Sequence, residues 1–190
     1  MNIILASQSP RRLFLLEAAG LTVDVRPSFI DESPMSAESA LSTTQRLCIE
    51  KAKACQVMDE KHPIIAADTL VAIHDEALGQ PLDLTEAKQM IQKLSGKQHQ
   101  VHTTVCVRWG DVYQSATVTT TVSFRDIKDE EIDVYVRCND ILDKAGAYAI
   151  QGGASGFITG IKGSLDNVIG LPVATTLALI EAVKGEVLPR

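Results

Sequence analysis

The sequence predicts a mixed α/β domain in which helices flank a twisted sheet, and two observations favour this fold class. In the N-terminal half, short apolar runs alternate with stretches of helical periodicity, a pattern typical of sheets covered by helices. The runs 101–109 and 112–124 are rich in threonine and valine, and only Gly110-Asp111 separates them, which indicates a hairpin. Because a hairpin interrupts the strand–helix alternation, we expect a mixed sheet and not a doubly wound parallel one.

The first seventy or so residues predict three strands separated by two helices. Short apolar runs at 2–6, 23–25 and 63–73 predict the strands, since buried strands need only a few consecutive apolar residues. One helix is expected over 10–19, where leucines recur at helical spacing and a glycine follows. The other is expected over 37–58, a stretch without glycine or proline.

The second half predicts three more helices around the hairpin. One covers 83–94, with Asp83 as its N-cap and Gly96 as its stop, the usual residue types at these positions. The others cover 129–138 and the C-terminal stretch from Leu171-Pro172 to about residue 184. The remaining segments are expected as a turn region and a glycine-rich loop with short apolar pieces: 75–81 and 143–170.

Length and charge limit the classes of function. A chain of 190 residues suffices for one full core and is short for two domains, so 1–190 is expected to be a single domain. Hydrophobic residues make up 45% and charged residues 22%, which excludes disordered and fibrous classes. The net charge of −6 argues against a nucleic-acid polymer as partner, because such proteins carry a basic stripe. It does not exclude a small polyanion held at one local basic site.

The cysteines and the hydropathy pattern indicate a cytoplasmic protein. The four cysteines form no C-x-x-C pair, and they are too sparse for a disulfide framework, so we expect reduced core thiols. No apolar run approaches the ~18 residues of a membrane span. The N-terminal apolar run 3–6 is too short for a secretion signal and no basic region precedes it.

The segment 7–12, with the sequence Ser-Gln-Ser-Pro-Arg-Arg, is a candidate anion site. A strand leads into this loop and a helix starts there, with Ser9 as the expected N-cap and Pro10 at the first helical position. Free backbone N–H groups and the helix dipole attract anions at such a point, and arginine forks match phosphate oxygens. The alternative is an ordinary capped helix with two surface arginines. No P-loop motif occurs.

Candidate carboxylates lie in a strand and in a loop. Asp68 interrupts an apolar run, where an acid is costly unless it has a partner or a cation. It is interpreted either as a metal ligand or base, or as a strand-end acid that caps a loop. Asp31-Glu32 offers the second carboxylate that a magnesium site needs, or is solvated surface. Lys51 is either a phosphate-binding lysine or part of a solvated helix face.

The glycine-rich segments 143–153 and 163–170 allow a ligand to approach the backbone closely. The amide of Gln151 can donate to and accept from the edge of a base. Both segments are equally explained as ordinary loops in which glycines allow the chain to turn. The histidines His99 and His102 lack the glutamate and spacing of a zinc helix, so we expect packing or surface residues there.

Taken together, these segments resemble the Maf-like nucleotide pyrophosphatases over nearly the whole chain. The resemblance is carried by motifs in family order and spacing: Ile4-Leu5-Ala6-Ser7-Gln8-Ser9-Pro10-Arg11-Arg12, Glu50-Lys51-Ala52, Ala67-Asp68-Thr69-Leu70-Val71, Asp143-Lys144-Ala145-Gly146-Ala147-Tyr148-Ala149-Ile150-Gln151-Gly152 and Asn167-Val168-Ile169-Gly170-Leu171-Pro172. It implies hydrolysis of a nucleoside triphosphate to a monophosphate and pyrophosphate with a divalent metal, Mg²⁺ or Mn²⁺. It also implies a mixed α/β fold with a deep cleft, similar to that of the inosine triphosphate pyrophosphatases. Family members are often dimers, although no sequence stripe here defines an interface.

The resemblance extends to one branch of the family and to residue roles. Asp68-Thr69 and the segment 145–152 look like the dTTP/UTP branch, in which the positions of Arg11, Thr69 and Gln151 are tied to substrate choice. As a mechanism we expect Asp68 to accept the proton of the attacking water and to share a metal with Glu32. The residues expected to hold the phosphates are Ser7, Ser9, Arg11, Arg12, Lys51 and Gln80.

Gln80 departs from the family pattern. The family usually has lysine before the proline, whereas this chain reads Gly79-Gln80-Pro81. A glutamine can hydrogen-bond a phosphate but cannot neutralise its charge, and a neutral contact is about half as strong as a charge-assisted one. We therefore expect an altered rate or an altered preference between tri- and diphosphates.

Two rival functions follow from the same residues. The first is a pyrophosphatase for 7-methyl-GTP or other non-standard nucleotides, which a panel of triphosphates distinguishes. The second is a weakly catalytic nucleotide-binding regulator of cell division, for which tight dTTP binding without metal-dependent turnover is the signature. A plain α/β interaction module leaves the segment 7–12 and Asp68 without an explanation.

Overall fold

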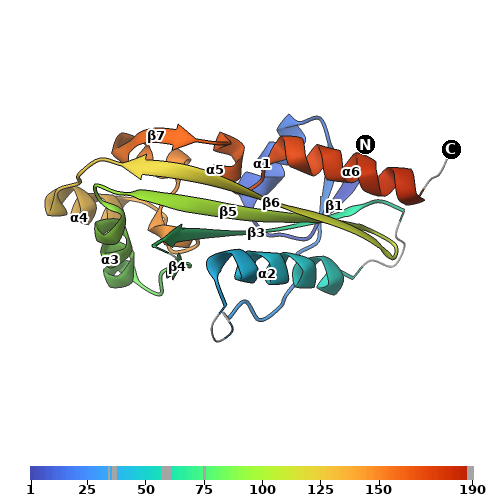
Figure 1. Ribbon diagram of the computed structural model, residues 1–190, viewed down its shortest axis with the longest axis horizontal. Helices are drawn as coiled ribbons and strands as arrows, with labels where there is room; N and C mark the ends of the chain where they lie inside the picture. The colour runs from blue at the N-terminus through green and yellow to red at the C-terminus, as the bar shows by residue number, and fades with distance from the viewer. Residues whose placement is uncertain (34, 36–37, 57–60, 75, 188–190) are drawn as a thin grey trace.

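One mixed sheet forms the centre of the computed structural model, which describes residues 1–33, 35, 38–56, 61–74 and 76–187 (Figure 1). Within these residues the strand order is β2-β1-β3-β5-β6-β7, and β4 pairs with β3. β1 is parallel to β2 and β3, and the other pairs are antiparallel. The mixed sheet predicted from the sequence is therefore confirmed. The strands are β1 (Asn2–Leu5), β2 (Thr22–Val25), β3 (Ile64–Ile73), β4 (Glu76–Leu78), β5 (Gln98–Trp109), β6 (Val112–Phe124) and β7 (Ile158–Lys162).

Helices cover both faces of the sheet near β1 and β3. α2 (Ala40–Ala54) lies on one face, and α1 (Pro10–Ala18) and α6 (Val173–Val187) lie on the other (Figure 1). Successive β1 residues explain this arrangement, because side chains alternate between the two faces of a sheet. Ile3 packs with Leu16 of α1 and Ile180 of α6, whereas Ile4 packs with Cys48 of α2. A strand segment buried on both faces is expected to be apolar, and the three buried residues of β1, Ile3, Ile4 and Leu5, are.

A separate core lies at the other end of the long hairpin. There α3 (Leu84–Leu94) and α4 (Asp129–Cys138) pack with buried residues of β3, β5 and β6. The Asp83 side chain accepts a hydrogen bond from Glu86 N at 2.8 Å and caps α3 as expected. The 3-10 turns η1 (Ala145–Ala147), η2 (Ile150–Gly152) and η3 (Ala154–Phe157) then lead to β7 and the short helix α5 (Leu165–Ile169).

Three expectations about the elements are wrong in detail. The helix expected over 37–58 begins only at Ala40, because the Ser39 side chain accepts from Ser42 N and caps it, and it ends at Ala54. Residues 37, 57 and 58 of that prediction lie outside the described residues. The expected turn over 75–81 contains β4, and the expected loop over 143–170 contains β7 and α5. Elements of five residues or fewer are too short to show a periodicity.

The cysteines are all free among the described residues. Cys48, Cys55 and Cys106 are buried, as the sequence predicts for core thiols, and burial raises the pKa of each thiol. Cys138 is exposed, so the core prediction is wrong for that residue. No helix in the described part of the chain is long and apolar enough to cross a membrane.

Candidate active site

A cavity of about 840 Å³ opens at a gap in the sheet. β1 pairs with β3 only at Ile64 and Ile65, and β4 pairs with β3 only from Val71 onward. Between these pairs, no described strand borders β3 on that edge. The gap exposes side chains from both faces of one strand, so the successive residues Asp68 and Thr69 both line the cavity.

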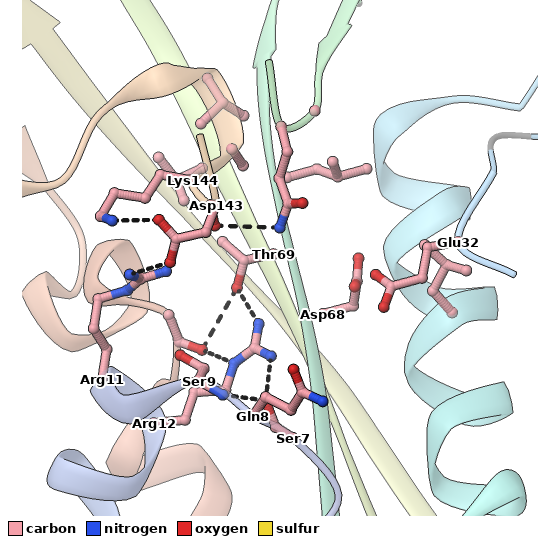
Figure 2. A pocket seen from close by; sticks show the side chains of 18 of the residues that line it. Ser7, Gln8, Ser9, Arg11, Arg12, Glu32, Asp68, Thr69, Asp143 and Lys144 are labelled. Atoms are coloured by element: carbon pink, nitrogen blue, oxygen red, sulfur yellow. Dashed lines mark hydrogen bonds and ion pairs between the residues drawn. The ribbon is translucent and has the colours of Figure 1, made fainter. Parts of the chain in front are cut away.

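Every site residue predicted from the sequence lines this cavity, although the chain supplies them from distant segments (Figure 2). They come from the loop after β1, the start of α1, the loop before α2, α2 itself, β3, the loop after β4 and the 3-10 turns. These residues are Ser7, Ser9, Arg11, Arg12, Glu32, Lys51, Asp68, Thr69, Gln80 and Gln151.

Arg12 connects several polar groups at the start of α1. Its guanidinium donates to Ser7 Oγ at 3.1 Å, to Thr69 Oγ1 at 3.1 Å and to the carbonyl of Gly170 at 2.9 Å (Figure 2). Burial lowers the pKa of Arg12, while the nearby Asp68 carboxylate opposes that shift. Arg12 is therefore not the surface arginine of the alternative interpretation, and it ties α1, β3 and the end of α5 together.

Ser9 occupies the N-cap position of α1 but does not cap the helix with its side chain. Its backbone N–H instead donates to Ser7 Oγ at 3.2 Å. The prediction of Ser9 as a side-chain cap is therefore wrong. Ser9 lines the cavity, and within the described part of the chain its hydroxyl has no hydrogen-bond partner, so it stays free to contact a ligand at the helix start.

Two carboxylates lie close together on one side of the cavity and share one lysine. Lys51 Nζ lies 2.7 Å from Asp68 Oδ1 and 2.6 Å from Glu32 Oε2. Figure 2 shows the carboxyl groups of Glu32 and Asp68 pointing toward one another. Lys51 and Asp68 are buried, whereas the Glu32 side chain is about half exposed. The other oxygen of Asp68, Oδ2, is buried without a hydrogen-bond partner, which is unusual for a carboxylate and leaves one acceptor unused.

A second group of charges lies on the opposite wall of the cavity. Asp143 accepts from Arg11 at 3.3 Å and makes a short contact with Lys144, while its backbone carbonyl accepts from Gln80 Nε2 at 3.2 Å. Burial alone would raise the pKa of the Asp143 carboxyl, but the hydrogen bond and charge of Lys144, together with Arg11, hold it below its usual value. Asp143 and Lys144 were not predicted as site residues, because a charged pair beside glycines has no distinctive local signal.

The turn that carries Gln151 is held against the sheet at several points. Gly146 has φ of +67°, and a Cβ built on it would lie 2.9 Å from Val71 Cγ2, so this position favours glycine for two reasons. The Gly146 N–H also donates to the carbonyl of Gly79 at 2.9 Å. Tyr148 is buried and lies 2.8 Å from His99 Nε2 through its hydroxyl. These contacts fix the segment from which Gln151 reaches the cavity.

The two histidines considered above are packing residues, as expected. His99 is buried between Phe124 and Tyr148 with edge-on ring contacts, and burial lowers its pKa to about 4. His102 is buried and lies 2.9 Å from Thr119 Oγ1 through Nδ1. Neither lines the cavity.

A family model described as Maf-like protein matches residues 2–183. The chain belongs to the Maf-like protein family. It is 44% identical over 183 residues to the dTTP/UTP pyrophosphatase of Anaeromyxobacter dehalogenans (strain 2CP-C), covering 94% of this chain and 92% of that protein. It is 41% identical over 186 residues to the dTTP/UTP pyrophosphatase of Geobacter sp. (strain M21), covering 96% and 95%. It is 42% identical over 182 residues to the dTTP/UTP pyrophosphatase of Myxococcus xanthus (strain DK1622), covering 94% of this chain and 91% of that protein.

The donor set of this Maf-like protein fits a magnesium or manganese ion that also contacts substrate. Mg²⁺ is usually held by one or two carboxylates together with phosphate oxygens and water. Asp68 and Glu32 supply two such carboxylates, and the unpartnered Asp68 Oδ2 is a buried oxygen without a protein donor. The described residues contain no group of three or more acidic, histidine or cysteine side chains arranged for a metal. Asp68 and Glu32 alone would leave most ligand positions of such an ion open.

Proposed function

We propose that the cavity hydrolyses dTTP and UTP to the nucleoside monophosphate and pyrophosphate. The observation that carries this proposal is the buried Asp68 carboxyl, which lines the same cavity as Arg11 and Arg12 at the start of α1 and has one oxygen, Oδ2, without a hydrogen-bond partner. A carboxylate beside a cationic helix start suits hydrolysis of a phosphoanhydride, where positioning and charge neutralisation do most of the catalysis. The name that the relatives carry, dTTP/UTP pyrophosphatase, supports the same reaction and the same bases.

The bond changes follow from the position of the base. A water oxygen attacks the α-phosphorus, the bond from that phosphorus to the bridging oxygen breaks, and pyrophosphate leaves with the bond electrons. Asp68 accepts the proton of the attacking water, since a base must lie within hydrogen-bond reach of the proton it removes. Of the two carboxyl oxygens, Oδ2 has no hydrogen-bond partner among the described residues, whereas Oδ1 accepts from Lys51 at 2.7 Å.

The phosphates are assigned to the space between the two charged walls of the cavity. Arg11 and Lys51 reach it from α1 and α2, and Lys51 can exchange its carboxylate partners for phosphate oxygens. The hydroxyls of Ser7 and Ser9 lie at the helix start, where N–H groups and the helix dipole also attract anions. Gln80 contributes only a neutral hydrogen bond, so it neutralises less of the phosphate charge than a lysine at the same position would.

Asp68 and Glu32 would hold the divalent metal between them and the substrate. When bound, such an ion neutralises negative charge on the phosphates and on the leaving pyrophosphate. Thr69 and Gln151 are assigned to the base, and Arg11 to substrate choice, as the resemblance implies. The cytoplasmic location and the homodimer stay predictions from the sequence.

A panel of triphosphates scored for released pyrophosphate tests the function. The panel contains dTTP, UTP, 5-methyl-UTP, CTP, ITP and 7-methyl-GTP, each with Mg²⁺ or Mn²⁺. We expect dTTP and UTP to be the best substrates, and Asp68→Asn to lower turnover by about 10²–10⁴-fold, the usual effect of losing a general base. The control is Asp24→Asn, an exposed carboxylate of β2 that lies outside the cavity.

Each alternative has its own outcome in this panel. Preference for 7-methyl-GTP or ITP would assign the protein to non-standard purines. Tight dTTP binding without metal-dependent pyrophosphate release would favour the regulator of cell division. An Asp68→Asn variant with wild-type turnover on dTTP would remove Asp68 from the role of base.

A further inference from the structure

A buried chain of hydroxyl groups runs from the cavity into the sheet behind it. Thr69 on β3 and Thr103 on β5 are directly paired in the strand register, and their Oγ1 atoms lie 2.9 Å apart. Thr103 Oγ1 in turn donates to the backbone carbonyl of Asn167 at 3.1 Å. Thr103 and Asn167 are completely buried, so no bulk water competes for these hydrogen bonds.

The number of hydroxyl protons determines which group donates and which accepts in each hydrogen bond of this hydroxyl chain. A hydroxyl has one proton and two lone pairs, whereas a carbonyl oxygen can only accept. The proton between Thr103 and the Asn167 carbonyl therefore belongs to Thr103, and Thr103 must accept from Thr69. Among the described residues, the Thr69 hydroxyl has one other acceptor, the carbonyl of Gly170, which is more distant at 3.5 Å and already accepts from Arg12.

Arg12 completes the assignment at Thr69. Its NH2 group donates to Thr69 Oγ1 at 3.1 Å and so occupies one of the two lone pairs. The single proton of Thr69 points to Thr103, into the protein. What Thr69 presents to the cavity is therefore the remaining lone pair, which makes it a hydrogen-bond acceptor for a ligand.

Ser7 shows the opposite arrangement on the other side of the same guanidinium. Its Oγ accepts from Arg12 NH1 at 3.1 Å and from the Ser9 N–H at 3.2 Å. Both lone pairs are then in use, and the Ser7 proton is free to be donated to a phosphate oxygen. One arginine thus polarises a donor hydroxyl for an anion and an acceptor hydroxyl for a different part of the ligand.

The far end of the chain is held firmly. The Asn167 side-chain amide donates to the carbonyl of Val101 at 3.0 Å and to Thr120 Oγ1 at 2.9 Å. Thr120 Oγ1 accepts in addition from Ser164 N at 3.1 Å, at the N-cap of α5. Because these bonds fix the Asn167 carbonyl relative to β5, the acceptor that Thr103 uses cannot move away.

We propose that Thr103 is a positioning residue that holds Thr69 as a hydrogen-bond acceptor, and that Thr69 accepts the N3–H of uracil or thymine. Cytosine carries a lone pair at N3, so it meets the Thr69 lone pair and is rejected. A buried polar group left unpaired by the wrong substrate is an effective means of discrimination. This inference rests on the proposed hydrolysis of dTTP and UTP, and it names the atom of the base that the site selects.

The test compares kcat/KM for UTP and CTP in the wild type and three variants. Thr103→Val keeps the shape but removes the acceptor for the Thr69 proton, which can then turn toward the cavity and pair with N3 of cytosine. We expect the UTP-to-CTP ratio to fall at least tenfold, mainly through a lower KM for CTP. Thr103→Ser restores the hydroxyl and should keep the wild-type ratio.

Thr104→Val is the matched control. Thr104 is a buried neighbour on the same strand, and its hydroxyl contacts Thr44 and Thr117 instead of Thr69. Its substitution should leave the UTP-to-CTP ratio unchanged, whatever it does to stability. The Asn167 carbonyl also accepts from the Gly170 N–H at 3.1 Å, so it does not become unpaired in Thr103→Val.

A second measurement uses the unaltered protein. Replacing UTP with 3-methyl-UTP removes the N3–H, and we expect kcat/KM to fall by at least tenfold. An unchanged UTP-to-CTP ratio in Thr103→Val, an equal fall in Thr103→Ser, or turnover of 3-methyl-UTP equal to that of UTP would overturn the role of the hydroxyl chain while leaving the pyrophosphatase function intact. Absence of pyrophosphate release from UTP by the wild type would overturn both proposals.

Discussion

At the scale of single residues, the account depends on buried charges that balance one another. Lys51 and Asp68 are both buried, and Glu32 adds a second carboxylate to the same ammonium group. A buried ion pair adds little net stability, but removal of one partner leaves an uncompensated charge. Lys51 therefore has a structural role before any substrate binds.

We expect Lys51→Met to lower the free energy of unfolding by about 3–5 kcal/mol, because the Asp68 carboxylate loses its buried counter-charge. In an Asp68→Asn background, the same substitution should cost less, since the charge that needed compensation is gone. Urea unfolding of the two single variants and the double variant measures this coupling as a double-mutant cycle. Strictly additive effects would contradict a direct charge interaction.

An exposed ion pair provides the control for that cycle. Lys93 Nζ lies 2.6 Å from Glu76 Oε1, and both side chains are more than a third exposed. Exposed pairs contribute about 1 kcal/mol or less. Lys93→Met should therefore change the unfolding free energy far less than Lys51→Met does.

At the scale of elements, the gap beside β3 and the turn around Gly146 create the site. Gly146→Ala should impair both folding and activity, because φ of +67° is strained for alanine and its Cβ would lie 2.9 Å from Val71 Cγ2. We expect loss of more than about 1–2 kcal/mol, and a raised KM for UTP, since the turn carries Gln151. Thermal unfolding and steady-state kinetics measure the two effects.

Gly20→Ala separates backbone strain from the clash. Gly20 has φ of +83°, but nothing lies within 4 Å of a Cβ placed there. This variant should lose only the cost of the backbone conformation and keep the wild-type KM. If Gly146→Ala behaved no differently, the contact with Val71 would have no part in placing the turn.

The sequence predicted the elements and residues whose signals are local. The loop 7–12 between a strand and a helix, and the acid within the run of β3, stand out because their neighbours in the chain reveal them. The hydroxyl chain could not be found in this way, since Thr69 and Thr103 are 34 residues apart and Thr103 and Asn167 are 64 apart. The gap beside β3 depends on where β1 ends in the register, which no local pattern encodes.

At the scale of the whole molecule, the net charge says little about the ligand or about stability, and the buried titratable groups matter more for both. The value of −6 describes the chain as a whole, whereas the site is a local balance of cations and carboxylates. The aromatic cluster behind the site contains a buried histidine, His99, which contacts Tyr148 and Phe124. Its burial links the stability of the fold to pH.

We expect the free energy of unfolding to fall as pH decreases from about 6.5 to 4. Burial lowers the pKa of His99 from 6.5 to about 4, so within this window the unfolded chain binds a proton that the folded chain does not. Stability rises with pH wherever the unfolded state binds more protons. The stability that the neutral, buried His99 contributes is thus complete above pH 6.5 and is lost as the pH falls toward 4. For a pKa shift of this size, the loss amounts to about 3 kcal/mol of unfolding free energy.

His99→Gln isolates this contribution. Glutamine cannot titrate, so urea unfolding measured between pH 7 and 4 should show a shallower pH dependence than the wild type. The curves of the two proteins are therefore expected to converge as the pH is lowered. Parallel curves over the whole range would mean that His99 is not the group responsible.

The central claim is that the Asp68 carboxylate directs water to the α-phosphorus of a pyrimidine nucleoside triphosphate. Hydrolysis of UTP in ¹⁸O-labelled water tests it most directly, with mass spectrometry of both products. The account predicts one ¹⁸O atom in UMP, none in pyrophosphate, and loss of this labelling reaction in Asp68→Asn. Label in the pyrophosphate, or release of inorganic phosphate with UDP, would contradict it.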